Sequence, residues 1–109
     1  MSGIKNRDFK FDRNSDQLFE AILCLKNKKE CEQFFRDVLT LSELQAMTER
    51  FVVAKELYSG TKSYRSINKD TGVSTATITR VAEWMKNGMG GYKLVLNRLF
   101  GGHHHHAKT

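Results

Sequence analysis

The sequence has 109 residues, of which 39% are hydrophobic, and a formal net charge of +6. This length allows one domain with a modest core. No apolar run approaches the roughly 20 residues of a membrane-spanning helix, and the polar start MSGIKNRDFKFDRN lacks the apolar centre of a signal peptide. We therefore expect a cytoplasmic protein with a flexible N-terminal arm over residues 1–14.

Two amphipathic helices are predicted in the first third of the chain. The first, from Asp16 to about Leu25, carries Leu18, Phe19, Ile22 and Leu23, and the second carries Cys31, Phe34, Phe35, Val38 and Leu39. With no proline and no convincing strand alternation, the chain is expected to be all-α, with about six helices. Cys24 and Cys31 are far from CxxC spacing, so we expect buried, reduced thiols rather than a disulfide or a zinc site.

A longer helix is predicted from about Ser42 to Ser59, with a stop at Gly60. Thr40 with Glu43 matches a capping box, and Ser42 with Gln45 gives a second possible start. It has apolar residues on two nearly opposite faces: Leu44, Met47, Phe51, Ala54 and Tyr58 on one, and Ala46, Val53 and Leu57 on the other. A helix apolar on two faces needs cover on both. A second copy of the chain would supply it, so we predict a homodimer with a large apolar interface; the alternative is a compact monomer.

Residues 64–81, YRSINKDTGVSTATITRV, are typical of two short helices joined by a glycine turn. Gly72 permits a positive φ, Val73 begins an apolar plug under the turn, and Ser74 is a suitable N-cap for a helix that continues to Lys86. The segment from Tyr64 to Lys86 is therefore a predicted helix-turn-helix.

The second helix of this segment has a predicted core face and a predicted outer face. The core face holds Ile78, Val81, Ala82 and Met85, and the outer face holds Ala76, Thr79, Arg80 and Glu83. Its start is small and hydroxyl-rich, with Ser74, Thr75, Ala76 and Thr77. Such side chains suit close approach to phosphates and base edges, although an ordinary helical hairpin with solvated threonines would show the same spacing.

The distribution of charge along the sequence favours DNA binding by the predicted helix-turn-helix. Residues 60–100 have a net charge of +5, whereas residues 14–59 have a net charge of −2. Positive charge concentrated around one motif is the electrostatic footprint of a surface that binds phosphates.

The C-terminal part contains glycines at 88, 90 and 91, which predict a flexible joint and a chain reversal before a last helix built on Tyr92, Val95, Leu96 and Leu99. A disordered tail is expected over residues 101–109; its four histidines could hold a metal, but nothing orders the imidazoles. No other histidine is present to activate a nucleophile, so we expect no enzyme, no cofactor and no metal site.

The segments TLSELQAMTERFVVAKELYSG and SYRSINKDTGVSTATITR resemble the Trp-repressor superfamily, especially its YerC/YecD-like branch. The resemblance covers about residues 15–100. It implies an intertwined, all-α homodimer in which two helix-turn-helix heads read a pseudo-palindromic operator.

The resemblance also implies DNA contacts. Arg65 matches a base-contacting arginine of the Trp repressor, the residues from Thr75 to Thr77 match the start of its recognition helix, and Thr79 matches a phosphate-contacting threonine. Lys69 falls on the exposed side of the first motif helix, where it either adds a phosphate contact or is merely solvated. The predicted DNA-binding residues are Arg65, Lys69, Ser74, Thr75, Ala76, Thr77, Thr79 and Arg80.

Thr40, Arg50 and Arg80 match positions that line the corepressor pocket of the Trp repressor. Two neighbouring positions differ, because Val81 replaces a glycine and Trp84 replaces a serine that bonds the ligand's amino group. Val81 would obstruct the indole ring of a bound tryptophan, and Trp84 could fill the space itself, so we expect no productive binding of tryptophan. If Trp84 occupies the pocket, we expect DNA binding to be constitutive. The ordinary alternatives are a surface ion pair for Arg50 and dimer core or a partly buried flank for Trp84.

The sequence thus predicts a DNA-binding transcriptional regulator, favoured as a repressor, whose partners are double-stranded DNA, a second copy of the chain and an unidentified small-molecule effector. The alternative is a helical protein-interaction module that keeps the motif as scaffold.

Overall fold

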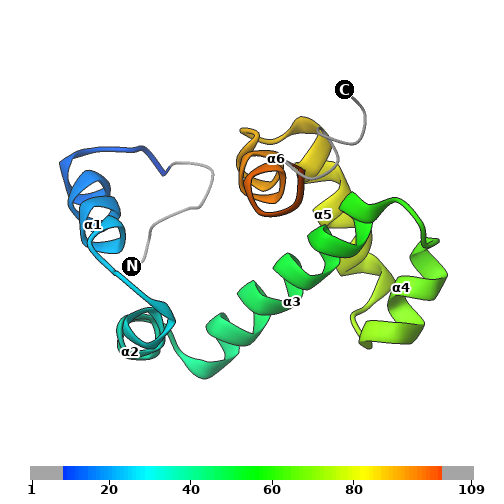
Figure 1. The fold of residues 1–109 in the computed structure, drawn as a ribbon, viewed down its shortest axis with the longest axis horizontal. Helices are drawn as coiled ribbons and strands as arrows, with labels where there is room; N and C mark the ends of the chain where they lie inside the picture. Colours follow the sequence, from blue (N-terminus) through cyan, green and yellow to red (C-terminus); the bar gives the residue numbers. More distant parts are fainter. Residues whose placement is uncertain (1–8, 102–109) are drawn as a thin grey trace. The chain divides into compact units, whose positions relative to one another are not determined.

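The computed structural model describes residues 9–101, and this part of the chain is all-α, with no strand (Figure 1). The order of elements is α1 (Arg13–Leu23), α2 (Lys28–Val38), α3 (Leu41–Ser59), α4 (Tyr64–Thr71), α5 (Thr75–Asn87), α6 (Gly91–Leu96) and a π-helical segment, η2 (Asn97–Gly101). The prediction of an all-α fold with about six helices is confirmed. The chain divides into two compact units, with the boundary between Leu41 and Ser42, and each is described separately.

Side-chain caps place the starts of α1 and α2 earlier than the sequence pattern indicates. The Ser15 backbone N–H donates to Asp12 Oδ1 (3.1 Å), and the Asp12 N–H donates to Ser15 Oγ (2.8 Å). This reciprocal cap starts α1 at Arg13, inside the stretch expected to be a flexible arm, and α1 ends at Leu23. Asn27 accepts from the Glu30 N–H (2.9 Å) and starts α2 at Lys28.

The first unit has no buried apolar residue among those described. Ser15 is its one buried side chain, while Phe19 and Leu23 are exposed. The prediction of free thiols is confirmed, but the prediction that Cys24 and Cys31 are buried is wrong, since both are exposed. The physical reason is that α1 and α2 alone do not provide enough helix surface to enclose a core.

The hydrophobic core lies in the second unit, where α3 to α6 each contribute. It consists of Val53, Ala54, Ile67, Val73, Ile78, Val81 and Leu96. Val53 and Ala54 belong to the two opposite stripes predicted for α3, and both are fully buried. The C-terminal half of α3 is therefore covered on two sides, as its pattern requires. Nearer its start Met47 is exposed.

Glycines shape the chain after α5, and the predicted last helix has two parts. Gly88 caps α5, and Gly90 takes a φ of +85° immediately before α6. After Leu96 the backbone continues as the π-helical segment, and the Tyr58 hydroxyl on α3 donates to Asn97 Oδ1 (2.7 Å). This bond and the buried Leu96 hold the C-terminal helix against α3. The histidine tail predicted over residues 101–109 falls, apart from Gly101, outside the described residues.

Within residues 9–101, no helix combines the length and the apolar character that crossing a membrane requires.

Candidate nucleic-acid interface

The segment from α4 to α5 is held by local hydrogen bonds at each of its ends and in its turn. Ser63 caps α4 by accepting from the Ser66 N–H (3.0 Å). In the turn, the Thr71 hydroxyl donates to the Ile67 carbonyl (2.6 Å) and accepts from the Val73 N–H (3.1 Å). Asn68 Nδ2 donates to the Val73 carbonyl (2.8 Å). The turn is thus pinned by three side-chain bonds, over a buried Val73.

Gly72 closes α4 in the left-handed region, with a φ of +77°. A Cβ at this position would meet no atom within 4 Å, so Gly72→Ala would add conformational strain without a clash. We expect a loss of about 1–2 kcal/mol in the free energy of unfolding. Urea titration followed by circular dichroism measures it.

The matched control for this prediction is Gly91→Ala at the first residue of α6. Its Cβ also meets nothing within 4 Å, but Gly91 is not among the positive-φ glycines. This variant should be neutral or slightly more stable than the parent. Equal losses in both variants would contradict the argument from backbone conformation.

The start of α5 presents small polar side chains to solvent. Ser74 Oγ accepts from the Thr77 N–H (3.1 Å) and lies 3.1 Å from the Thr77 hydroxyl, so both hydroxyls take part in the cap. Thr77 is half-buried, whereas Ser74, Thr75 and Ala76 are exposed. The predicted faces of this helix are confirmed, because Ile78 and Val81 are buried and Thr79 and Arg80 are exposed.

Three cations of α4 and α5 form no ion pair within the described residues. Arg65, Lys69 and Arg80 are exposed, and none forms an ion pair with any residue that the structure describes. Their positive charge is available to an external anion.

Lys62 contributes to the positive charge of residues 60–100, but unlike these three cations it forms ion pairs within the chain. Its Nζ lies 2.9 Å from Asp70 Oδ2 on α4 and 3.0 Å from Glu56 Oε1 on α3. The hydrogen bonds to Asp70 and then to Glu56 raise the pKa of the Lys62 ammonium. Lys62 therefore links α3 to α4, and its charge is already matched, which the linear sequence did not indicate.

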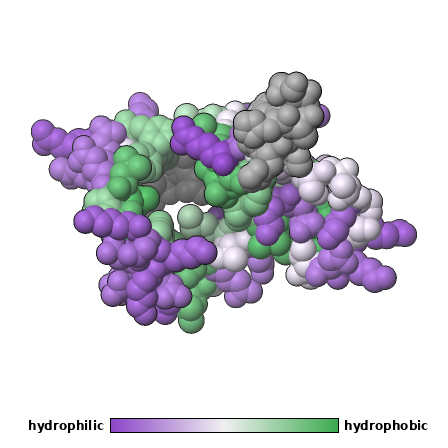
Figure 2. All heavy atoms as spheres, viewed as in Figure 1, coloured by the Kyte–Doolittle hydropathy of each residue, from purple (hydrophilic) through white to green (hydrophobic). Residues whose placement is uncertain are grey.

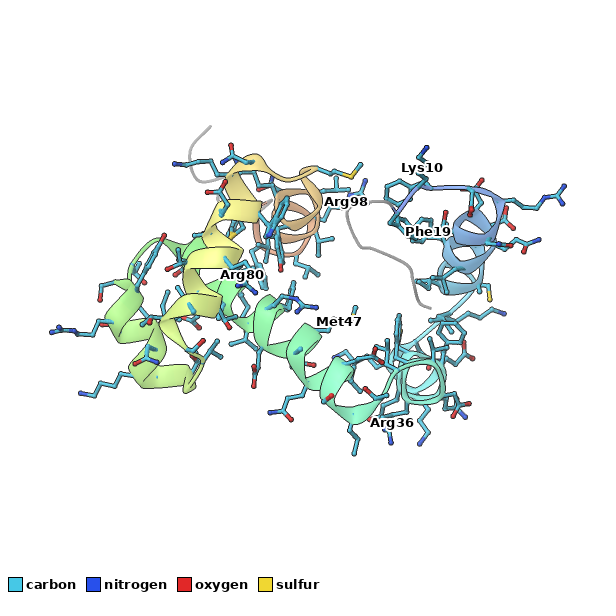
Figure 3. All side chains as sticks on the ribbon, turned by 180° about the vertical axis from the view of Figure 1, so that it is seen from behind. Lys10, Phe19, Arg36, Met47, Arg80 and Arg98 are labelled. Atoms are coloured by element: carbon cyan, nitrogen blue, oxygen red, sulfur yellow. The ribbon has the colours of Figure 1, made fainter. Side chains whose placement is uncertain are left out.

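Two adjoining hollows lie beside α5 in the second unit. The smaller, of about 270 Å³, is lined by Arg50, Thr77, Arg80, Val81, Trp84 and Tyr92. The larger, of about 430 Å³, shares Arg50, Trp84 and Tyr92 and extends over Met47, Phe51, Met89 and Val95. Figure 3 labels Met47 on α3 and Arg80 on α5, two of the helices that form these walls, and α6 contributes Tyr92 and Val95.

The smaller hollow brings together four of the five predicted pocket residues. Arg50, Arg80, Val81 and Trp84 line it, while Thr40 belongs to the first unit and is not among its lining residues. Arg50 makes no ion pair with a described residue, so the surface pair considered for it is absent from residues 9–101. The Trp84 side chain forms a wall of both hollows and is 58% exposed in the single chain.

Among residues 9–101, no group of three or more histidine, cysteine or acidic side chains is placed to hold a metal ion.

Comparison with known proteins identifies the class to which this fold and surface belong. The profile of the family described as Trp repressor protein matches residues 13–100, which covers most of the chain. The chain therefore belongs to the Trp repressor family. Membership in this family suggests a DNA-binding regulator.

Particular relatives agree with this membership and with the YerC-like branch. The chain is 43% identical over 84 residues to Bacillus subtilis YerC, an uncharacterized protein, covering 77% of this chain and 80% of YerC. A TrpR-like protein from Eubacterium eligens matches with a TM-score of 0.76 and 43% identity, covering 81% of this chain and 90% of its own. A Trp repressor candidate from Staphylococcus aureus matches with a TM-score of 0.76 and 39% identity, and the match covers 82% of this chain and 88% of the Staphylococcus aureus chain.

Proposed function

We propose that this protein is a sequence-specific DNA-binding transcriptional regulator, acting in the cytoplasm as a repressor that blocks access to a promoter. The observation that carries the proposal is the exposed start of α5, which presents small, hydroxyl-bearing side chains over a buried core, together with the exposed and unpaired cations of α4 and α5. The segment from α4 to α5 is then a helix-turn-helix, with α5 as the recognition helix.

Each part of this surface suits one kind of DNA contact. Arg65 has the planar fork of donors that pairs with the acceptor edge of guanine in the major groove. Lys69 and Thr79 suit phosphate oxygens, which position the protein without reading sequence. Thr75 and Ala76 are small enough to let the helix approach base edges, including the thymine methyl group.

We propose a homodimer as the DNA-binding form. The first unit exposes large apolar side chains on amphipathic helices and buries none among its described residues. Figure 2 shows apolar side chains at the surface in the part of the molecule formed by α1 and α2. A second copy of the chain is the occupant that we propose for this surface, and it would place two recognition helices on the half-sites of a pseudo-palindromic operator.

Arg65→Ala is expected to reduce sequence preference by about 1–3 kcal/mol at one base position of each half-site, since alanine cannot bond the guanine edge. The measurement is fluorescence anisotropy on a duplex selected from a random library, with single-base variants of that duplex. The matched control is Lys62→Ala, which removes a cation whose charge is already neutralised by Asp70 and Glu56. An equal loss of sequence preference in Arg65→Ala and Lys62→Ala would contradict the proposed role of Arg65.

The parent protein should bind DNA with an affinity that falls steeply as the salt concentration rises, because phosphate contacts release counterions. Absence of binding at low salt would favour a protein-interaction module instead.

Tryptophan is not the effector in this proposal. Val81 is buried under the smaller hollow and Trp84 forms its wall, so the space differs from a site shaped for a free indole ring. DNA binding is therefore proposed to be independent of tryptophan. A rise in operator affinity on adding L-tryptophan would contradict this.

A further inference from the structure

Another hollow of the second unit lies where α3, the end of α5 and α6 meet. Its volume is about 260 Å³, and it is lined by Leu57, Ala82, Met85, Lys86 and Lys93. None of these residues lines either of the two hollows beside Trp84. It is therefore a separate surface feature, which we call the lysine hollow.

The apolar part of the lysine hollow is supported by the hydrophobic core. Leu57 of α3 and Met85 of α5 are partly buried and pack against the core residues. Ala82, one turn before Lys86, is also partly buried. Because these side chains are already held in place, a partner that covers them does not have to order them on binding. The lysine hollow therefore offers a preformed contact for an apolar side chain.

The polar part of the lysine hollow consists of two cations. Lys86 and Lys93 are exposed, and neither forms an ion pair with a described residue. Glu83, the one acidic residue of α5, accepts a hydrogen bond from Asn87 Nδ2 (2.7 Å). Among the described residues, no carboxylate, amide or hydroxyl side chain lines the hollow. Its polar side-chain groups are thus all positively charged donors, so a partner has to supply negatively charged acceptors.

The size and the position of the lysine hollow favour a protein segment as its occupant. A volume of about 260 Å³ is below the roughly 300–1,000 Å³ of small-molecule sites, but it accommodates a large apolar side chain. The phosphates of DNA would pair with the lysines, yet a sugar–phosphate backbone has no large apolar group to cover Leu57 and Met85. The hollow also lies at the end of α5, whereas the proposed DNA contacts of this helix stop at Arg80.

We propose that the lysine hollow is a docking site for an acidic segment of another protein, in which a large apolar side chain is flanked by carboxylates. The apolar side chain covers Leu57, Ala82 and Met85. The carboxylates pair with the ammonium groups of Lys86 and Lys93, whose aliphatic stems extend the apolar contact. The inference does not rest on the proposed DNA binding, because the hollow shares no residue with the proposed DNA contacts.

The test uses the full chain, without DNA, and three fluorescein-labelled peptides. GSEEDLFDEEGS has an apolar pair between acidic residues, GSEEDSSDEEGS lacks the apolar pair, and GSQQNLFNQQGS lacks the charges. Fluorescence anisotropy should show the first peptide binding at least about tenfold more tightly than either of the others, since only it matches both parts of the hollow. Equal binding of GSEEDSSDEEGS, or no saturable binding of GSEEDLFDEEGS at millimolar concentration, would overturn the proposal.

Substitutions in the lysine hollow locate the binding of the first peptide. Lys86→Gln and Lys93→Gln should each weaken it by about threefold, as one exposed ion pair is lost. Ala82→Asp should weaken it by about tenfold or more, because it places a carboxylate against the acidic peptide. The control is Lys55→Gln, at an exposed position of α3 that does not line the hollow. Thermal denaturation checks that each variant is folded, and an equal loss in Lys55→Gln would contradict docking at this site.

Titration with duplex DNA separates the lysine hollow from the proposed DNA interface. Lys86→Gln and Lys93→Gln should change DNA affinity no more than Lys55→Gln does. A larger loss of DNA affinity, without a loss of peptide affinity, would assign both lysines to the DNA surface and overturn the proposal. If the parent protein does not bind DNA at all, the proposed function fails, while the peptide titrations still decide the present inference.

Discussion

Replacing Ile78 by alanine is expected to lower the free energy of unfolding by about 2–5 kcal/mol, because the side chain is fully buried and the smaller one leaves a cavity. Ile78 lies on α5 in a core with Ile67 of α4 and Val53 of α3. Few residues share this core, so the loss of one large side chain removes a substantial part of the packing that orients α5. DNA affinity should fall with stability, since the proposed recognition helix loses its support.

Thr79→Ala is the control for this prediction, because Thr79 follows Ile78 in α5 but lies on the exposed face of the helix. Thr79 is exposed, so its truncation should change stability by less than about 0.5 kcal/mol while still removing a proposed phosphate contact. Thermal unfolding and DNA titration, both at one fixed protein concentration, separate the effects. If Ile78→Ala unfolds at the parent temperature, or Thr79→Ala loses as much stability as Ile78→Ala, the described core is not what holds α5.

Local interactions explain why the segment from α4 to α5 was predictable from the sequence. Gly72 in the left-handed region and Ser74 as an N-cap depend on residues only a few positions away. The buried face of α5 follows from helical periodicity alone. The sequence pattern therefore led to the correct elements and the correct faces.

The starts of α1 and α2 were less predictable, because several polar residues precede each apolar stripe. Asp12 caps α1 through its pairing with Ser15, and Asn27 caps α2, both ahead of the first apolar residue of each pattern. Periodicity locates the apolar face of a helix but not the polar first turn that comes before it. The predicted start of the first helix, at Asp16, was accordingly three residues late.

Ion pairs, burial and hollows that depend on residues far apart in the sequence could not be predicted from it. Lys62 meets Glu56 and Asp70 only because α3 and α4 bring them together, so a count of charges overstated the free positive charge near the motif. The burial predicted for Cys24 and Cys31 assumed cover that the chain's first unit does not contain. The positions matched to a ligand pocket included Arg50 and Arg80, but the adjoining apolar hollow contains Met47 and Val95, which no motif marked.

Leu23→Asp is expected to convert the proposed homodimer into monomers and to weaken binding to a two-half-site operator by about 100-fold or more, since the two heads would no longer act together. Leu23 ends α1 and is 82% exposed in the single chain, and Phe19 lies one turn before it, also exposed. A leucine so exposed beside a phenylalanine is explained if a second copy covers both. A carboxylate at this position would then be buried without a partner.

Gln17→Asp supplies the control for the dimer prediction, because it introduces the same charge at an exposed, polar position of α1. Light scattering coupled to size-exclusion chromatography measures the mass, which should be that of two chains for the parent and for Gln17→Asp and of one chain for Leu23→Asp. Circular dichroism checks that the second unit, whose core does not include Leu23, remains helical. A parent protein that is monomeric at all concentrations, or a Leu23→Asp variant that stays dimeric, would show that α1 does not mediate assembly, and the apolar side chains of the first unit would then need another partner.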